Sequence, residues 1–204
     1  MARRARTPRT VIVFMRQPVL GRVKTRLARQ VGSLAAWQFY RRASSRLLRR
    51  LRAEPSWRVV VAWAGPPEPR SRMRPGDLLQ GRGDIGARMQ RCLAAAPSGP
   101  VLLLGADIPD VRARHIQGAF AALARAPLVF GPARDGGFWL VGARSPAHLP
   151  RPLFAPGIRW SSGETLADTL AGLRCDVALA DTLADVDHAQ DLPKPESLTG
   201  FPGR

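Results

Sequence analysis

A basic, glycine-containing segment follows the first apolar run of the chain. It reads Pro18-Val-Leu-Gly-Arg-Val-Lys-Thr-Arg-Leu27 and holds one of only two lysines among 32 basic residues. A lysine ammonium is a compact charge on a flexible stem, which suits a phosphate chain that moves during a reaction. The side chains of Arg22, Lys24 and Arg26 can converge on one polyanion, and Gly21 lets backbone N–H groups approach it closely. The segment therefore predicts a phosphate-binding loop.

A carboxylate follows a later apolar run directly, in Gly105-Ala-Asp107. A buried strand ending there would deliver Asp107 to the rim of a sheet, where it could bind Mg²⁺ or Mn²⁺ together with substrate phosphate oxygens. The alternative is that Asp107 or Asp110 caps the helix expected near Val111. Spacing makes Asp110 the better cap, which leaves Asp107 available for a metal.

A second acidic group comes after the last expected strand, and it contains Asp181, Asp185, Asp187 and Asp191. Taken alone, this group is equally well explained as a solvated loop. Paired with Asp107 across a basic loop, it favours a metal site, because a metal that bridges phosphates needs carboxylates from separate strand ends.

Three further segments could contact a nucleotide or an acceptor. The turn at Asp135 could present this carboxylate to an acceptor hydroxyl, with Gly136 and Gly137 allowing close approach, and a plain Asp-Gly hairpin turn is an equal alternative. Trp160 could stack on a donor or acceptor ring, although packing in the core is the favoured interpretation. The glycine-rich stretch from Gln80 to Gly86 precedes a helix and could line a base or a phosphate.

Strands and helices must position these candidates. Short apolar runs typical of strands alternate along the chain with segments whose apolar residues recur at helical spacing. Strands are expected at residues 9–15, 57–63, 100–104, 128–130, 138–141 and 175–179, and no element is placed in the loop-like stretch 68–76. Helices are expected from residue 24, at 33–53, from 84 with Asp84 as cap, from 111, and from a capping box at 161–164 to 172, with a short one from 185. The alternation predicts an α/β layered fold with a mainly parallel sheet, whose ligands lie at the carboxyl ends of the strands.

Length and composition narrow the class of protein. A chain of 204 residues predicts one domain, which we place at residues 10–192, between a basic extension (1–9) and a mobile tail (193–204). The N-terminus lacks the features of a secretory signal and no apolar run could span a bilayer, so a cytoplasmic protein without a membrane partner is expected. The cysteines, Cys92 and Cys175, suggest neither a disulfide nor a zinc site, and both are expected to be buried.

The formal charge of +17 raises nucleic acid as a partner. The excess is almost entirely arginine and is spread over the chain. Its one concentration falls at 41–52, on a helix whose other face is apolar. A solvated helix face is therefore favoured over a nucleic-acid-binding stripe.

Six motifs, in order along the chain, resemble a known bacterial family. They are Pro18-x-x-Gly-Arg-Val-Lys-Thr-Arg-Leu27, Gln80-Gly-x-Gly-Asp-Ile-Gly-x-Arg-Met89, Gly105-x-Asp-x-Pro109, Gly131-Pro-Ala-x-Asp-Gly-Gly137, Trp160-Ser161 and Asp185-Val-Asp-x-x-x-Asp-Leu192. The family is the glycosyltransferase-like one described as radical-SAM/selenodomain-associated or arsenosugar-biosynthesis transferases. The resemblance implies the nucleotide-diphospho-sugar transferase (GT-A-like) fold, a three-layer α/β/α Rossmann-like domain.

The resemblance also implies roles for individual residues. The loop is similar to that of 2-phospholactate guanylyltransferases and other nucleotidylyltransferases, in which such a Lys and Arg hold a triphosphate. Asp107 and Asp187 are similar to the metal-binding carboxylates of cytidylyltransferases for acidic sugars. The chain departs from its relatives at Ile108, where they often carry Cys, and at His188, where many carry Thr.

The expected function is a metal-dependent transferase that uses a nucleotide or nucleotide-sugar donor, Mg²⁺ or Mn²⁺, and a small-molecule acceptor. Lys24, with Arg22 and Arg26, would stabilise charge on the leaving diphosphate, and Asp135 would orient the acceptor. Glycosyl transfer is the first hypothesis and nucleotidylyl transfer the second. A non-catalytic, arginine-rich polyanion-binding protein is the alternative from another class.

Overall fold

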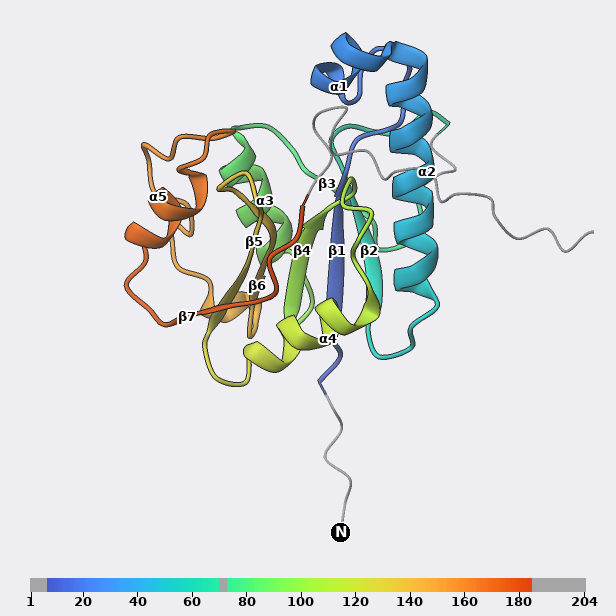
Figure 1. The fold of residues 1–204 in the computed structure, drawn as a ribbon. Helices are drawn as coiled ribbons and strands as arrows, with labels where there is room; N and C mark the ends of the chain where they lie inside the picture. Colours follow the sequence, from blue (N-terminus) through green and yellow to red (C-terminus); the bar gives the residue numbers. More distant parts are fainter. Residues whose placement is uncertain (1–6, 70–72, 185–204) are drawn as a thin grey trace, which may run out of the picture.

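The computed structural model of the protein describes residues 7–69 and 73–184 (Figure 1). The elements follow one another as β1 (Thr10–Met15), α1 (Thr25–Val31), α2 (Ser33–Arg52), β2 (Arg58–Trp63), β3 (Leu78–Leu79), α3 (Ile85–Ala94), β4 (Val101–Gly105), α4 (Ala113–Ala122), β5 (Leu128–Pro132), β6 (Phe138–Ala143), the 3₁₀ helix η2 (Pro146–His148), α5 (Thr165–Ala171) and β7 (Val177–Leu179). Asp187, the basic extension up to residue 6 and the tail at 193–204 lie outside the described residues.

The strands form one sheet in the order β3-β2-β1-β4-β6-β5-β7. β1 pairs in parallel with both β2 and β4, whereas β6 pairs antiparallel with β4 and β5. All described strands other than β6 therefore point the same way. This confirms the predicted α/β fold with a mostly parallel, mixed sheet.

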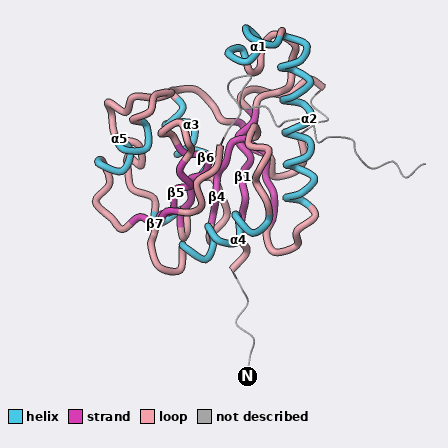
Figure 2. The backbone as a smooth tube through the Cα atoms, in the orientation of Figure 1, coloured by secondary structure: helices cyan, strands magenta, loops and turns pink. Residues whose placement is uncertain are grey.

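Helices cover both faces of the sheet, as Figures 1 and 2 show. The reason is visible in β1, whose successive side chains point to opposite faces. Val11 and Val13 belong to the apolar cluster that includes α2 and α4, while Ile12 belongs to the cluster that includes α3. The predicted three-layer arrangement is confirmed. None of the described helices combines the length and apolar character needed to cross a bilayer.

Several local expectations differ from the structure. β3 was not expected, because two residues are too few to show an alternating pattern. α4 begins at Ala113 with Arg112 at its N-cap, so Asp110 does not cap it. Asp84 does cap α3, since its Oδ1 accepts a hydrogen bond of 2.7 Å from Ala87 N. Cys92 is buried as expected, but Cys175 is exposed.

The expected capping box at residues 161–164 is wrong in register. α5 begins at Thr165, and the Glu164 side chain makes no capping bond. Thr165 Oγ1 bonds to the Ser162 backbone instead. It accepts from Ser162 N at 3.3 Å, and its one proton is shared between Arg159 O at 2.7 Å and Ser162 O at 3.0 Å. The shift leaves Ser161 outside the cap, in a left-handed backbone conformation with φ of 60°.

Candidate functional site

The carboxyl ends of the neighbouring strands β1 and β4 lie side by side at the C-terminal end of the parallel strands, where Phe14 is in register with Gly105. The basic loop leaves this end from β1, and Asp107 leaves it from β4. Lys24 Nζ lies 2.7 Å from Asp107 Oδ2, with side chains that are 7% and 30% exposed. Two residues 83 positions apart in the chain thus form a largely buried ion pair at the strand ends.

The backbone on each side of the ion pair is specialised. Lys24 has φ of 49° and is the N-cap of α1, a left-handed conformation that residues other than glycine seldom adopt. Gly105 leaves room for the carboxylate, because a Cβ there would lie 2.9 Å from Asp107 Oδ1. The Gly-x-Asp spacing therefore has a steric reason, which is that the acid folds back over the end of its own strand.

A pocket of about 430 Å³ opens beside this pair. Among the described side chains that line it, Asp107 is the one carboxylate, and it faces five basic groups: Arg16, Arg22, Lys24, Arg26 and Arg88. Such a surplus of positive charge in a partly enclosed site favours a polyanionic ligand. We refer to this cavity as the basic pocket.

Tyr40, from α2, also lines the basic pocket. Its hydroxyl accepts from Arg16 N at 3.0 Å and donates to Arg16 O at 3.1 Å. Burial raises the pKa of this phenol to about 12, while the hydrogen bond from the Arg16 backbone acts in the opposite direction. The neutral phenol thereby ties α2 to the first residue after β1, where the basic loop begins.

A second pocket, of about 230 Å³, adjoins the first. The two share the lining residues Arg26, Ile85, Gly105, Asp107 and Ser161. The smaller one is walled by aromatic rings and also receives the carboxylate of Asp135. We refer to it as the aromatic pocket.

Two tryptophans form part of the aromatic pocket, and both also have packing partners. Trp160 meets Phe154 and Phe138 edge-on, with ring centroids 5.5 and 6.5 Å apart. Trp139 is 3% exposed and donates from Nε1 to Asp181 O at 2.9 Å. Both rings are therefore held rigidly at the pocket wall.

The turn between β5 and β6 carries Asp135. Its Oδ1 accepts from Gly137 N at 2.9 Å, which fixes the carboxylate in a local turn, and Gly137 also lines the aromatic pocket. Gly136 packs so tightly against the 159–165 loop that a Cβ on it would overlap the Gly163 carbonyl oxygen. Gly136 thus permits backbone contact between two loops.

The structure brings some of the sequence-predicted residues together and leaves others apart. Lys24, Arg22, Arg26, Gln80 and Asp107 line the basic pocket, and Asp135, Gly137 and Trp160 line the aromatic pocket. Gly21, Gly86 and Gly136 line neither of the two.

Gln80 and Gly86 also have structural tasks. Gln80 is 2% exposed, and its Nε2 donates to Ala62 O at 2.9 Å and to Met15 O at 3.3 Å, so it joins the ends of β1 and β2. Gly86 is buried in α3, and a Cβ there would lie 2.7 Å from the Trp160 ring.

Four polar lining residues outside the predicted phosphate-binding loop were not predicted as part of the site: Arg16, Tyr40, Arg88 and Ser161. The helical pattern placed Tyr40 among apolar core positions, which hid its hydroxyl. Arg88 lies four residues after the N-cap residue Asp84, so both are on the same face of α3. This spacing could have predicted that the Arg88 side chain lies near the loop before α3. Ser161 was assigned to a capping box, and no sequence signal reveals its left-handed backbone.

The described residues offer a partial fit for a divalent cation. They contain no cluster of three or more His, Cys, Asp or Glu side chains, and Asp107 already carries the Lys24 ammonium. Mg²⁺ commonly takes only one or two carboxylates and completes its shell with water and substrate phosphates. Asp107 fits such a cation when the phosphates of a nucleotide accompany it.

Solved structures share this fold. A crystal structure of a candidate nucleotide-diphospho-sugar transferase from Desulfovibrio desulfuricans is 27% identical, with a TM-score of 0.78 over 88% of this chain and 82% of that one. Bifunctional IspDF from Campylobacter jejuni is 10% identical, with a TM-score of 0.59 over 91% of this chain and 53% of that one. The 2-C-methyl-D-erythritol 4-phosphate cytidylyltransferase from Thermus thermophilus is 20% identical, with a TM-score of 0.51 over 91% and 95%.

The last two comparisons concern the fold alone, and the first supports the resemblance inferred from the six motifs. No curated protein matches the sequence. The sequence profile of one bacterial family, described as "Uncharacterized protein conserved in bacteria (DUF2064)", matches residues 47–162. This match covers more than half of the chain and includes Asp107, Asp135 and Trp160. The protein therefore belongs to the bacterial family DUF2064.

Proposed function

We propose that the protein is a transferase that binds a nucleotide or nucleotide-sugar donor in the basic pocket and a small-molecule acceptor in the aromatic pocket. The observation that carries the proposal is the Lys24–Asp107 ion pair at the wall between a strongly basic cavity and an aromatic one. The 27% identical structure described as a candidate nucleotide-diphospho-sugar transferase supports the same class.

The donor's phosphates would lie among Arg22, Lys24 and Arg26. Charge builds up on the leaving diphosphate as its bond to the transferred group breaks, and fixed cations in a partly enclosed site stabilise that charge more strongly than water does. Lys24 is suited to follow the phosphates because its ammonium sits on a flexible stem. Arg26 lines both pockets and would contact the donor closest to the acceptor.

The acceptor would lie against Trp160 and Gly137, with Asp135 accepting a hydrogen bond from its hydroxyl group. A carboxylate in this place orients the attacking oxygen and takes up its proton as the new bond forms. The acceptor's size is limited by the pocket volume of about 230 Å³, which suits a small molecule.

Mg²⁺ or Mn²⁺ would be held by Asp107, with Asp187, outside the described residues, as the proposed second carboxylate. When bound with the donor, such a cation neutralises charge on the leaving phosphates. Lys24 would then move from Asp107 Oδ2 toward the phosphates, since the ammonium and the cation compete for one carboxylate.

Glycosyl transfer is the first form of this proposal, and nucleotidylyl transfer is the second. The five basic groups around the basic pocket favour the second form as well, because a triphosphate carries more charge than a diphosphate. The two forms differ in their product. Glycosyl transfer from a nucleotide-diphospho-sugar releases a nucleoside diphosphate, and nucleotidylyl transfer from a nucleoside triphosphate releases pyrophosphate.

A thermal-shift panel tests the donor site. Nucleoside triphosphates and nucleotide sugars, each with Mn²⁺, should raise the melting temperature of the wild type, because a ligand that binds only the folded state stabilises it. Lys24→Ala and Asp107→Asn should abolish the rise. Arg29→Ala removes an arginine from the last turn of α1, away from both pockets, and should keep the rise. No rise in the wild type with any donor would refute the proposal.

The same panel separates a transferase from a non-catalytic polyanion-binding protein. Polyanion binding collapses with added salt and does not depend on Asp107. The arginines of α2 would form the polyanion-binding face, but one of them, Arg50, already has a structural contact, because its Nη1 donates a hydrogen bond to Pro109 O at 2.9 Å. Heparin or DNA that stabilised the wild type and Asp107→Asn equally, while no nucleotide did, would favour the polyanion-binding protein.

A further inference from the structure

The described residues contain two non-glycine positions with positive φ, and both line the basic pocket. They are Lys24, with φ of 49°, and Ser161, with φ of 60°. A left-handed conformation at a residue other than glycine is unfavourable and persists only where the surroundings enforce it, which happens most often at functional sites. Lys24 already has a place in the proposed donor site. Ser161 has none.

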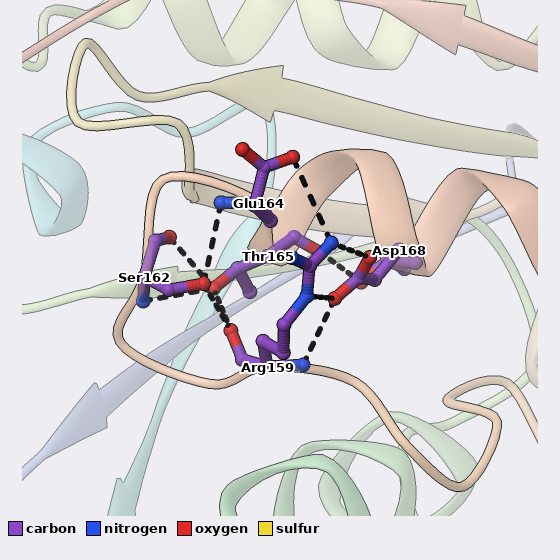
Figure 3. Close-up of polar contacts among 6 residues, drawn as sticks. Arg159, Ser162, Glu164, Thr165 and Asp168 are labelled. Carbon is purple, nitrogen blue, oxygen red and sulfur yellow. Dashed lines mark hydrogen bonds and ion pairs between the residues drawn. The ribbon is translucent and has the colours of Figure 1, made fainter.

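Hydrogen bonds hold the chain on both sides of Ser161, and those among Arg159, Ser162, Thr165 and Asp168 can be followed in Figure 3. The Arg159 guanidinium forms a bidentate pair with Asp168 of α5, with Nε to Oδ2 at 2.9 Å and Nη2 to Oδ1 at 2.7 Å. Asp168 Oδ2 also accepts from Arg159 N at 3.0 Å. This bonding anchors the chain two residues before Ser161 to the helix that follows it.

The next two hydroxyl groups in the loop are used internally. Ser162 Oγ and Thr165 Oγ1 each donate to Arg159 O at 2.7 Å. Glu164 N in turn donates to Ser162 Oγ at 3.2 Å. The loop is therefore closed on itself around Arg159 by every hydroxyl it carries except that of Ser161.

The Ser161 hydroxyl makes no hydrogen bond to any part of the chain that the structure describes. The residue is exposed and belongs to the lining of both pockets, beside Arg26 and Asp107. A strained backbone, a rigid support and an unused hydroxyl at the junction of two cavities are together what a substrate-contacting group requires.

We infer that the Ser161 hydroxyl donates a hydrogen bond to an oxygen atom of the donor's transferred group, at the point where the basic pocket meets the aromatic pocket. Arg159 and Asp168 are positioning residues that act through Ser161. This inference rests on the proposed function, because it assumes a donor in the basic pocket. It adds a polar contact from the loop before α5 to a site whose other proposed donor contacts come from the segments that follow β1 and β4.

The test measures dissociation constants by titration calorimetry for UDP-glucose, GDP-mannose, CTP and GTP, each with Mn²⁺. Ser161→Ala removes the hydroxyl and keeps the Cβ, and Ser161→Gly removes both the hydroxyl and the strain. Both variants should weaken binding of the probes that the wild type binds by about five- to tenfold, the loss expected for one hydrogen bond to a charged or polar ligand. Ser161→Gly should melt no lower than the wild type.

Two further variants make the test specific. Ser45→Ala removes an exposed serine hydroxyl from α2, away from the pockets, and should bind as the wild type does. Arg159→Ala should weaken binding in the wild-type background and have no further effect in Ser161→Gly. A purely structural role of Arg159 predicts the same loss of affinity in both backgrounds.

The outcomes distinguish this inference from the proposed function. Wild-type binding that Lys24→Ala abolishes, but that both Ser161 variants retain within twofold, overturns the role of Ser161 and leaves the donor site intact. A wild type that binds none of the four probes overturns both proposals. Equal effects of Arg159→Ala in both backgrounds overturn the positioning role of Arg159.

Discussion

Lys24 and Asp107 are bonded to each other at 2.7 Å although they were predicted separately, one for phosphate binding and one for metal binding. Each charge therefore stabilises the other in the unliganded protein. A donor that brings phosphates and a cation would replace this one ion pair with two, Lys24 with phosphate and Asp107 with metal. The site can accept such a donor without leaving either charge unpaired.

The ion pair should contribute to stability in the absence of any ligand. Lys24→Met leaves the partly buried Asp107 carboxylate without its nearest cation, and we expect a loss of about 1 to 3 kcal/mol in the free energy of unfolding. Asp107→Asn in the same chain should recover part of that loss, because a neutral amide is less costly to bury. Urea denaturation of the wild type, the Lys24→Met variant and the double variant measures both values. Equal stabilities of the Lys24→Met variant and the double variant would contradict the coupling between the two charges.

Tyr40 should titrate at an unusually high pH. It is the only tyrosine in the chain, so the ultraviolet absorbance of phenolate reports on this residue alone. We expect a pKa of about 12 in the folded protein, raised mainly by burial from the ordinary value of 10.0. In denaturant, the pKa of Tyr40 should return toward the ordinary value.

The sign of this shift also predicts a dependence of stability on pH. Because the pKa is higher in the folded state, the contribution of the neutral phenol is complete below pH 10.0 and is lost as the pH rises through about 12. Tyr40→Phe should lose about 1 to 3 kcal/mol at neutral pH, since two backbone groups of Arg16 lose their partner. Its stability should change less between these pH values than that of the wild type.

The Arg159–Asp168 pair predicts an effect at the acid end. Hydrogen bonds from the Arg159 side chain and backbone lower the pKa of Asp168 from 3.8 to about 2. A depressed pKa means that the contribution is present above the unfolded value and is lost as the pH falls through the folded value. The difference in unfolding free energy between the wild type and Asp168→Asn should therefore be constant above pH 3.8 and disappear near pH 2. A difference that persisted unchanged at pH 2 would contradict the assignment.

Gly136 and Gly157 form a matched pair for testing the contact between the two loops. Both have positive φ, 85° and 92°, but a Cβ on Gly157 has no atom within 4 Å, whereas one on Gly136 would overlap the Gly163 carbonyl. Gly157→Ala should cost about 1 kcal/mol from backbone strain alone. Gly136→Ala should cost about 2 to 4 kcal/mol, because the 159–165 loop must also move.

The same two variants should differ in function. Displacement of the 159–165 loop moves Ser161 and Trp160, so Gly136→Ala should weaken donor binding while Gly157→Ala should not. Calorimetric unfolding and donor titration check the two effects. Similar losses in both variants would show that the close approach of the loops has no energetic weight.

The sequence predicted the layers and the edge of the sheet at which the candidate residues meet, for identifiable reasons. Apolar runs such as Val101–Leu104 are buried on both faces, and parallel pairing brings their ends together. Once β1 and β4 are parallel neighbours, Lys24 and Asp107, which follow them, must lie at the same end of the sheet. That the two touch could not be predicted, because it depends on the left-handed backbone at Lys24 and on the space above Gly105.

Other features had no signal in the sequence. The proposed role of Ser161 depends on φ of 60°, in a loop that is held by the bonding of Arg159 to Asp168 of α5, nine residues further on. Tyr40 matches the apolar stripe of α2, and only its distance to the Arg16 backbone reveals the polar task of its hydroxyl. β3 has two residues and pairs because Trp63 offers an open edge, a tertiary effect that no local pattern records.

The pairing of β1 with β4 joins segments that are far apart in the chain, and β6 extends this arrangement to the aromatic pocket. Contacts over such long separations form late and slowly during folding, since long loops must close first. Both cavities thus come into being only when nearly the whole domain has assembled. A donor that bridges their walls would slow global unfolding, so its presence should protect the central strands from hydrogen exchange as strongly as it protects the loops that touch it.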